Sequence, residues 1–74
     1  MTGSDVIIHT ISVNGEHRDV PAGTTLDGLV ATLTTARGGV AAAVNEAVVP
    51  RGQWPFVPLG HGDRVEVLTA VQGG

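Results

Sequence analysis

The chain has no cysteine and no lysine among its 74 residues, and Trp54 and Phe56 are its only Trp, Tyr or Phe residues. Without cysteine there is no disulfide, no thiolate nucleophile and no thiolate metal ligand, so hydrophobic packing must hold the fold. A cytoplasmic setting fits this composition best. The absence of lysine also removes the side-chain amines that isopeptide-linked chains of this protein would need.

Basic charge and long apolar runs are scarce too. Four arginines stand against seven acidic residues, which gives a formal net charge of −3 and no basic stripe, so nucleic acid is a poor candidate partner. No apolar run reaches the length of a membrane span, and the start MTGSD does not resemble a secretory signal. A chain this short buries about 60% of its unfolded surface, which leaves little room for an enclosed substrate cavity and argues against an independent enzyme.

The first part of the chain predicts a hairpin. The segment VIIHTISVNGEHRDV alternates around Asn14-Gly15, a pair that readily supplies the two positive φ angles of a tight turn. We expect two antiparallel strands over residues 6–13 and 16–20. Pro21 cannot donate a ladder hydrogen bond, so it should end the second strand.

A helix with one apolar face follows in TTLDGLVATL. Four apolar residues recur there at helical spacing, and we expect all four to be buried against the sheet: Leu26, Leu29, Val30 and Leu33. Thr24 with Asp27 predicts a capping box, which places the helix start near Thr24. Gly28 is unfavourable in mid-helix, and we interpret it as a point of close packing on the sheet.

Beyond the helix the sequence alternates between strand and turn signals. Gly38-Gly39 ends any helix that continues past Ala36, and VAAAVNEAVV predicts a second hairpin around Asn45-Glu46. The next segment carries residues that we expect to exclude regular structure: Pro50, Gly52, Pro55, Pro58 and Gly60.

The segment HGDRVEVLTAV predicts a turn at Gly62-Asp63 and a last strand. Alternation divides that strand into one face with Val65, Val67, Thr69 and Val71 and another with Arg64, Glu66, Leu68 and Ala70. A hairpin, a helix that crosses one face, and further strands fit an α+β fold of the β-grasp (ubiquitin-like) type. We expect a mixed sheet of four to five strands, one main helix on one face, and the last strand beside the first and parallel to it.

This arrangement gives the end of the chain, VQGG, a geometric meaning. If the last strand is central, its end is anchored, and Gln72, Gly73 and Gly74 project as a slim tail with little side-chain bulk. Val71 marks the anchored root. We therefore expect a flexible leader over residues 1–5, a domain over residues 6–71 and a flexible tail over residues 72–74.

At this point the chain resembles the ThiS family of thiamin-biosynthesis sulfur carriers, within the MoaD-ThiS superfamily. The resemblance runs from Ile11 to Gly74 and rests on ordered segments: VNG, AGTTLDGLV, AVNEAVVPRGQW, GDRVEV and VQGG. The Pro-rich WPFVPLGHGD departs from the family pattern. VVPRGQW favours the thiamin branch over the small subunit of molybdopterin synthase, which is one alternative; a non-reactive β-grasp interaction module is the other.

The resemblance implies a chemistry for Gly74. A ThiF-type adenylyltransferase would use ATP to adenylate its carboxylate, a relay from a cysteine desulfurase would supply sulfur for a thiocarboxylate, and the thiazole synthase ThiG would accept that sulfur. The protein is then a co-substrate, with no bound cofactor and no catalytic residues of its own, and we expect a monomer when it is free.

The remaining side chains suggest few other sites. His9, His17 and His61 lack metal-ligand spacing, and scattered serines and carboxylates indicate no catalytic triad. We expect Trp54 and Phe56 mainly to pack a satellite core, with a partner contact at either of them as the alternative. We expect Arg51 to be a solvated loop charge or a partner contact. Only one sheet face can lie under a single helix, so Leu68 and Ala70 are predicted to dock a partner near the tail.

Overall fold

The computed structural model describes residues 6–35 and 38–70 of the protein. The predicted leader and residues 71–74, including Val71, Gln72, Gly73 and Gly74, lie outside the described residues, so the predicted domain boundaries stay predictions. Seven elements follow in order: β1 (Ile8–Val13), β2 (Glu16–Pro21), α1 (Leu26–Leu33), β3 (Val40–Val44), β4 (Ala47–Val49), the 3₁₀ helix η1 (Arg51–Phe56) and β5 (Arg64–Thr69).

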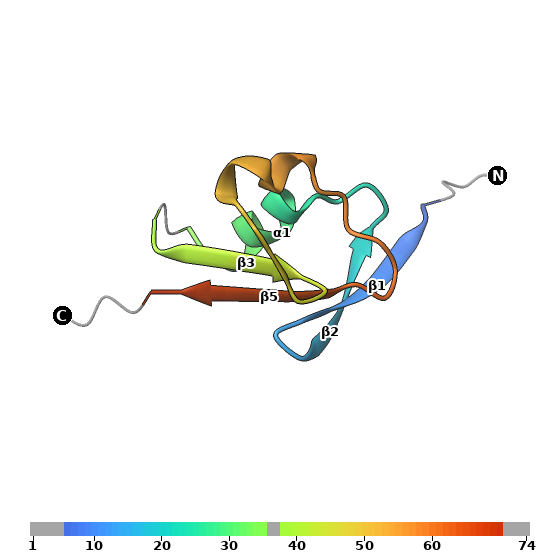
Figure 1. Ribbon diagram of the computed structural model, residues 1–74. Helices are drawn as coiled ribbons and strands as arrows, with labels where there is room; N and C mark the ends of the chain where they lie inside the picture. The colour runs from blue at the N-terminus through green and yellow to red at the C-terminus, as the bar shows by residue number, and fades with distance from the viewer. Residues whose placement is uncertain (1–5, 36–37, 71–74) are drawn as a thin grey trace.

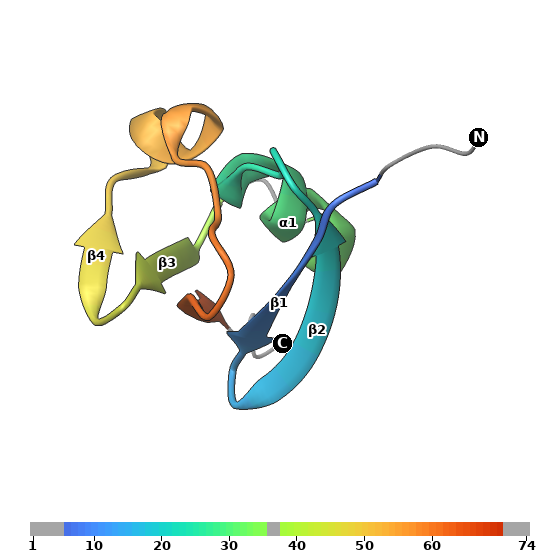
Figure 2. The same cartoon turned by 90° about the vertical axis from the view of Figure 1, so that its right-hand side faces the viewer.

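The five strands form a mixed sheet in the order β2-β1-β5-β3-β4, so the last strand of the chain is the central one. β5 runs parallel to β1 through Ser12↔Arg64 and Val13↔Val65, and antiparallel to β3 from Val40↔Thr69 to Val44↔Val65. Helix α1 and η1 lie on one side of this sheet, α1 towards β1 and β2 and η1 towards β3 and β4 (Figures 1 and 2). This is the β-grasp arrangement that the sequence predicts.

The core lies between the sheet and the two helices. It is built from apolar side chains of every layer: Ile11, Val13, Val20, Leu26, Leu29, Val30, Ala42, Trp54, Leu59, Val65 and Val67. Three of the four predicted helix residues are in it. Leu33 is 37% exposed, so its predicted burial is wrong; it is the last residue of α1, and the backbone is extended from Thr34.

Helix α1 begins slightly later than predicted and ends at Leu33, the last residue of the predicted apolar face. Its N-cap is Thr25, whose hydroxyl accepts a hydrogen bond from the Gly28 N–H at 3.2 Å, while the Thr24 hydroxyl donates to the Pro21 carbonyl at 2.7 Å. The Thr24–Asp27 capping box is therefore wrong by one residue, since either threonine can accept from a backbone N–H three positions on. At the other end the backbone becomes extended at Thr34, a β-branched residue that favours strand conformations.

Gly28 does not mark close packing on the sheet. It is exposed, and a Cβ placed on it would meet only Thr25 Oγ1 at 3.6 Å and the Thr24 methyl at 4.0 Å, both on the preceding turn. The cost of glycine in this helix is thus not offset by a contact with the sheet.

Both predicted hairpin turns are present. Asn14 and Gly15 have φ of 52° and 87°, and Asn45 and Glu46 have φ of 51° and 73°. Two consecutive residues with positive φ match the right-handed twist of the flanking strands, which is why such turns join antiparallel pairs. The first strand begins at Ile8, two residues later than predicted, because pairing with β2 starts at Ile8↔Pro21.

The Pro-rich segment does contain regular structure, contrary to the prediction. η1 is a 3₁₀ helix, bounded by the turn in which Gln53 N–H donates to the Pro50 carbonyl at 2.9 Å and the turn in which Val57 N–H donates to the Trp54 carbonyl at 3.3 Å. Pro55 is the second residue of the second turn, a position that proline favours and that needs no N–H. Short i to i+3 turns therefore tolerate prolines that a longer α-helix excludes.

Candidate functional site

The candidate site is the end of β5 together with the sheet face that the helices leave open. The position of this strand end depends first on the backbone pairing of β5. Its backbone pairs with β3 along five residue pairs and with β1 along two. Core strands are among the most stable parts of a domain, and β5 is held in the sheet up to its last pair with β3, at Thr69.

Asn14 adds a side-chain clamp on β5. Its amide nitrogen Nδ2 donates to the Val67 carbonyl at 3.1 Å, and its Oδ1 accepts from the Val67 N–H at 2.9 Å. Its own N–H donates to the Val65 carbonyl at 2.9 Å. The side chain thereby continues the β1–β5 ladder past the last strand residue of β1.

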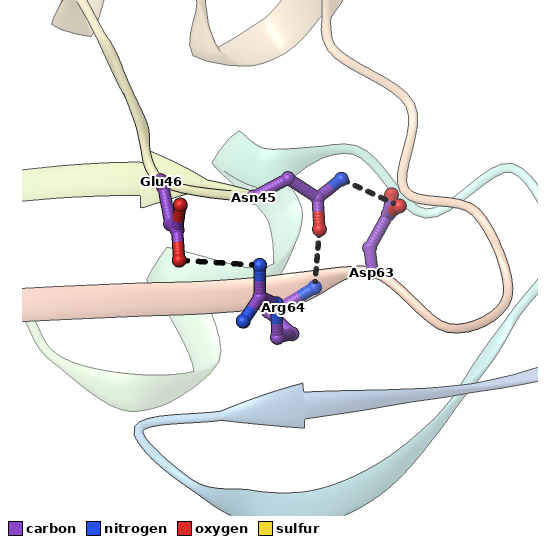
Figure 3. A network of polar contacts seen from close by, with 4 residues as sticks. All are labelled: Asn45, Glu46, Asp63 and Arg64. Carbon is purple, nitrogen blue, oxygen red and sulfur yellow. Dashed lines mark hydrogen bonds and ion pairs between the residues drawn. The ribbon is translucent and has the colours of Figure 1, made fainter.

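A second polar network fixes the start of β5 (Figure 3). Asn45 Oδ1 accepts from the Arg64 N–H at 3.0 Å and its Nδ2 donates to Asp63 Oδ1 at 3.0 Å, while the other Asp63 oxygen accepts from Gly60 N–H at 2.7 Å. Asp63 is thus a turn residue, as predicted. Arg64 and Glu46 form an ion pair at 3.3 Å, but both side chains are well exposed, so the pair contributes about 0 to 1 kcal/mol.

At the far end of β5 the described chain stops at Ala70. Its N–H donates to the Gly39 carbonyl at 2.6 Å, one residue beyond the last β3–β5 pair. The predicted reactive position, Gly74, is four positions after Ala70 and lies outside the described residues, as do Val71, Gln72 and Gly73.

The open face of the sheet carries an apolar patch. Leu68 is 70% exposed, as expected for the face opposite Val67, and Val48 on the edge strand is 78% exposed. With Ala41, Ala43 and Glu66 these side chains line a shallow hollow of about 150 Å³, and we call this set the open-face patch. Val48 and the two alanines were not among the docking residues predicted from the sequence. The predicted second hairpin could have indicated them: its turn at Asn45-Glu46 pairs Ala43 with Val48, and Ala43 also pairs with Glu66, on the same face as Leu68.

Arg51 and Phe56 lie on η1, on the helix-covered side of the sheet, and so away from Leu68 (Figure 2). Phe56 is 80% exposed, which overturns the prediction that it packs a satellite core. Trp54 belongs to the main core instead, 2% exposed, with its Nε1 donating to the Val49 carbonyl at 2.9 Å. The Arg51 guanidinium is 5.2 Å from the Trp54 ring centroid, so this exposed charge rests on an aromatic face.

A larger hollow of about 650 Å³ lies between β2 and α1. Its two charged residues already have hydroxyl partners: Arg18 donates to the Thr32 hydroxyl at 3.4 Å, and Asp19 accepts from the Thr10 hydroxyl at 2.7 Å. The two opposite charges give the hollow no net charge with which to select an ionic ligand.

Within residues 6–35 and 38–70 there is no group of three or more His, Asp or Glu side chains that could hold a metal ion. His9 and His61 have ring centroids 6.0 Å apart, and His61 Nδ1 accepts a hydrogen bond from the Thr10 N–H at 3.0 Å. No helix of the described residues is long and apolar enough to span a bilayer.

Comparison with known proteins identifies relatives of two sizes. A 64-residue alignment covers 86% of this chain at 44% identity but only 20% of a thiazole synthase from Magnetococcus marinus. A second thiazole synthase, from Paramagnetospirillum magneticum, is 31% identical over 62 residues. The chain therefore spans about a fifth of the length of these two relatives.

The other relatives have the size of this chain. The sulfur carrier protein ThiS of Escherichia coli is 31% identical over 64 residues, which cover 86% of this chain and 97% of that protein. The crystal structure of the thiamine biosynthesis protein ThiS from Geobacter metallireducens superposes with a TM-score of 0.68 at 26% identity, over 88% of this chain and 99% of that one. The family model of ThiS matches residues 11–74. The chain belongs to the ThiS family.

Proposed function

We propose that this protein is a sulfur carrier for the thiazole branch of thiamin biosynthesis and that the carboxylate of Gly74 carries the sulfur. The observation that supports this most directly is the match with ThiS of Escherichia coli along 97% of that protein, because the alignment has the size of a whole carrier. The anchored β5 supplies the geometric support, since a tail that follows a fixed strand can present its end to an enzyme.

The proposed chemistry has two steps at the chain end. A carboxylate is a poor electrophile, so a ThiF-type adenylyltransferase first lets a Gly74 carboxylate oxygen displace pyrophosphate from ATP, forming an acyl adenylate. A cysteine-desulfurase relay carries sulfur as a persulfide, from which a thiol reductant releases hydrosulfide and is itself oxidised to a disulfide. The hydrosulfide attacks the acyl carbon, and AMP leaves with the shared oxygen. The product is a thiocarboxylate. ATP is consumed by the activating enzyme and is not a cofactor of this chain, which acts as a co-substrate in the cytoplasm.

Thiazole synthase is the proposed sulfur acceptor. Two proteins of that name contain a segment similar to this chain, and a carrier joined to the enzyme that uses its sulfur would have a high effective concentration there. The open-face patch is the proposed docking surface for the activating enzyme or the synthase, because it is apolar, exposed and on the strand that leads to the tail. Arg51 and Phe56 remain separate candidate contacts on the other side.

The test is conversion of the purified chain by a ThiF-type enzyme with ATP and sulfide, followed by intact mass. We expect the mass change of one sulfur-for-oxygen exchange, absent without ATP. ThiS of Escherichia coli is the positive control for the enzyme. The thiocarboxylate is then offered to thiazole synthase and to the large subunit of molybdopterin synthase, and sulfur transfer to the second alone would overturn the thiamin assignment. No mass change, with the control converted, would favour a non-reactive interaction module.

A further inference from the structure

Gly39 holds Ala70, the last residue that the structure describes. Its carbonyl accepts the Ala70 N–H at 2.6 Å, directly after the Val40↔Thr69 pair. The backbone pairing between these two segments thus extends one residue beyond the strands, to Ala70. No other backbone hydrogen bond outside the regular elements reaches this residue within the described chain.

Only glycine allows this approach. Gly39 has φ of +70°, and a Cβ placed on it would lie 2.9 Å from the Ala70 Cβ and 3.8 Å from the Ala70 nitrogen. Two carbon atoms at optimal separation are about 3.5 to 4.0 Å apart, so one of the two segments would have to move. The obstructing methyl is attached directly to the backbone, and no side-chain rotation can relieve the contact.

The other described glycines with positive φ do not share this feature. At Gly15, Gly23 and Gly62 an added Cβ would meet nothing within 4 Å, so turn conformation alone accounts for glycine there. Gly38, adjacent to Gly39, also has open space and has no positive φ in the range that disfavours side chains. The close contact with another segment is specific to Gly39 among these positions.

We propose that Gly39 is a positioning residue for the reaction at Gly74, because its contact fixes Ala70, directly before Val71, the predicted root of the tail. This inference rests on the proposed function. Four residues separate Ala70 from the reacting carboxylate, so a fixed origin limits the space that the carboxylate samples. Its effective concentration in the adenylation site rises accordingly. Gly39 acts through Ala70 and does not contact ATP or the activating enzyme in this proposal.

The test compares Gly39→Ala with two matched variants. Gly23→Ala also places a side chain at a positive φ, of +92°, at a site near the start of α1, and Gly38→Ala adds a methyl beside Gly39 in open space. Adenylation is followed as pyrophosphate release by a ThiF-type enzyme over a range of carrier concentrations. We expect kcat/KM to fall about tenfold or more for Gly39→Ala relative to Gly23→Ala, with Gly38→Ala at the wild-type value.

Two further variants separate the clash with the Ala70 methyl from the backbone strain that a side chain causes at positive φ. Gly39→Asn also places a Cβ against the Ala70 methyl, but asparagine tolerates positive φ, so this variant should lose activity with less loss of stability. It replaces Gly39→Ala if that protein fails to fold. Ala70→Gly removes the methyl, so adding it to Gly39→Ala should restore most of the activity relative to Ala70→Gly alone. Hydrogen exchange of the Ala70 amide should be faster in Gly39→Ala and Gly39→Asn than in the two matched variants.

Equal kcat/KM for folded Gly39→Asn and Gly38→Ala, with wild type adenylated normally, would overturn the positioning role and leave the proposed function intact. Failure of wild type itself, with an enzyme that adenylates ThiS of Escherichia coli, would overturn the proposed function instead.

Discussion

The side-chain amide of Asn14 satisfies both backbone polar groups of Val67, donating to its carbonyl at 3.1 Å and accepting from its N–H at 2.9 Å. An asparagine at a hairpin turn thus acts as one more residue of the parallel β1–β5 ladder. Only two residue pairs join those strands directly, so this clamp is a large share of what holds the central strand on that side.

Asn14→Gly tests the clamp without disturbing the turn. Glycine keeps the positive φ of 52° but removes both hydrogen bonds to Val67. We expect the free energy of unfolding to fall by about 1 to 3 kcal/mol, at about 0.5 to 1.5 kcal/mol for each bond. Urea denaturation measures the change. A midpoint equal to that of wild type, with an unchanged slope, would show that the clamp does not stabilise the fold.

Leu29 and Leu33 provide a matched pair on one helix. Leu29 is 2% exposed and Leu33 is 37% exposed, so truncation should leave a cavity only at the first. Leu29→Ala is expected to cost about 2 to 5 kcal/mol, and Leu33→Ala less than about 1 kcal/mol. Thermal or urea unfolding of the two variants checks the difference. An equal loss of unfolding free energy in the two variants would contradict the difference in burial between Leu29 and Leu33.

Gly28→Ala should stabilise the protein. A methyl there would be exposed and would meet Thr25 Oγ1 at 3.6 Å, an ordinary van der Waals distance. Alanine is favoured over glycine inside a helix by about 0.8 to 1.0 kcal/mol, and we expect a gain approaching that value. The denaturation midpoint is the readout. A lower midpoint would mean that the glycine has a packing role after all.

Leu68→Asp tests the open-face patch as a docking surface. Leu68 is 70% exposed, so the variant should remain folded, while a charge in an apolar contact should raise the dissociation constant for the activating enzyme or thiazole synthase about tenfold or more. Val48→Asp, in the same patch, should act in the same direction. Calorimetric titration gives both affinities.

Ile7→Asp is the control for that series, because Ile7 is 65% exposed but lies before β1 and outside the patch. Phe56→Asp reports on the other side of the sheet. Unchanged affinity of Leu68→Asp for both enzymes would remove the patch from the account, and a loss only in Phe56→Asp would move the interface to η1.

Sequence reasoning was most successful where a local signal has one structural solution. Asn14-Gly15 needs positive φ at two consecutive positions, and helical spacing with strand alternation assigns faces, so the hairpin, the burial of Leu29 and the exposure of Leu68 were predictable. A hairpin followed by a helix that crosses one face of the sheet also predicted the parallel pairing of the last strand with the first.

The errors arose where tertiary contacts choose between local alternatives. Thr24 and Thr25 have equal capping chemistry, and backbone pairing selects between them: the Leu26 N–H donates to the Val57 carbonyl and the Leu59 N–H to the Thr24 carbonyl. The prolines of the segment that contains η1 predicted irregular structure, because the sequence does not reveal the hydrogen bonds that form this short helix. Likewise the Gly39 contact with Ala70 joins residues 31 positions apart, which no local pattern reveals.

The most direct test of the sulfur-carrier account is thiocarboxylate formation at Gly74, measured by intact mass with one preparation of activating enzyme, ATP and sulfide. Wild type is compared with Gly74→Ala, with a one-residue extension after Gly74 and with deletion of Gly73 and Gly74. An extra residue displaces the reacting carbon by up to about 3.6 Å, and a misplacement of about 1 Å can cost a hundredfold in rate. The account predicts rapid conversion of wild type, slower conversion of Gly74→Ala and none in the extended and truncated proteins, all four with the same unfolding midpoint. Wild-type rates in the extended and truncated proteins would contradict it.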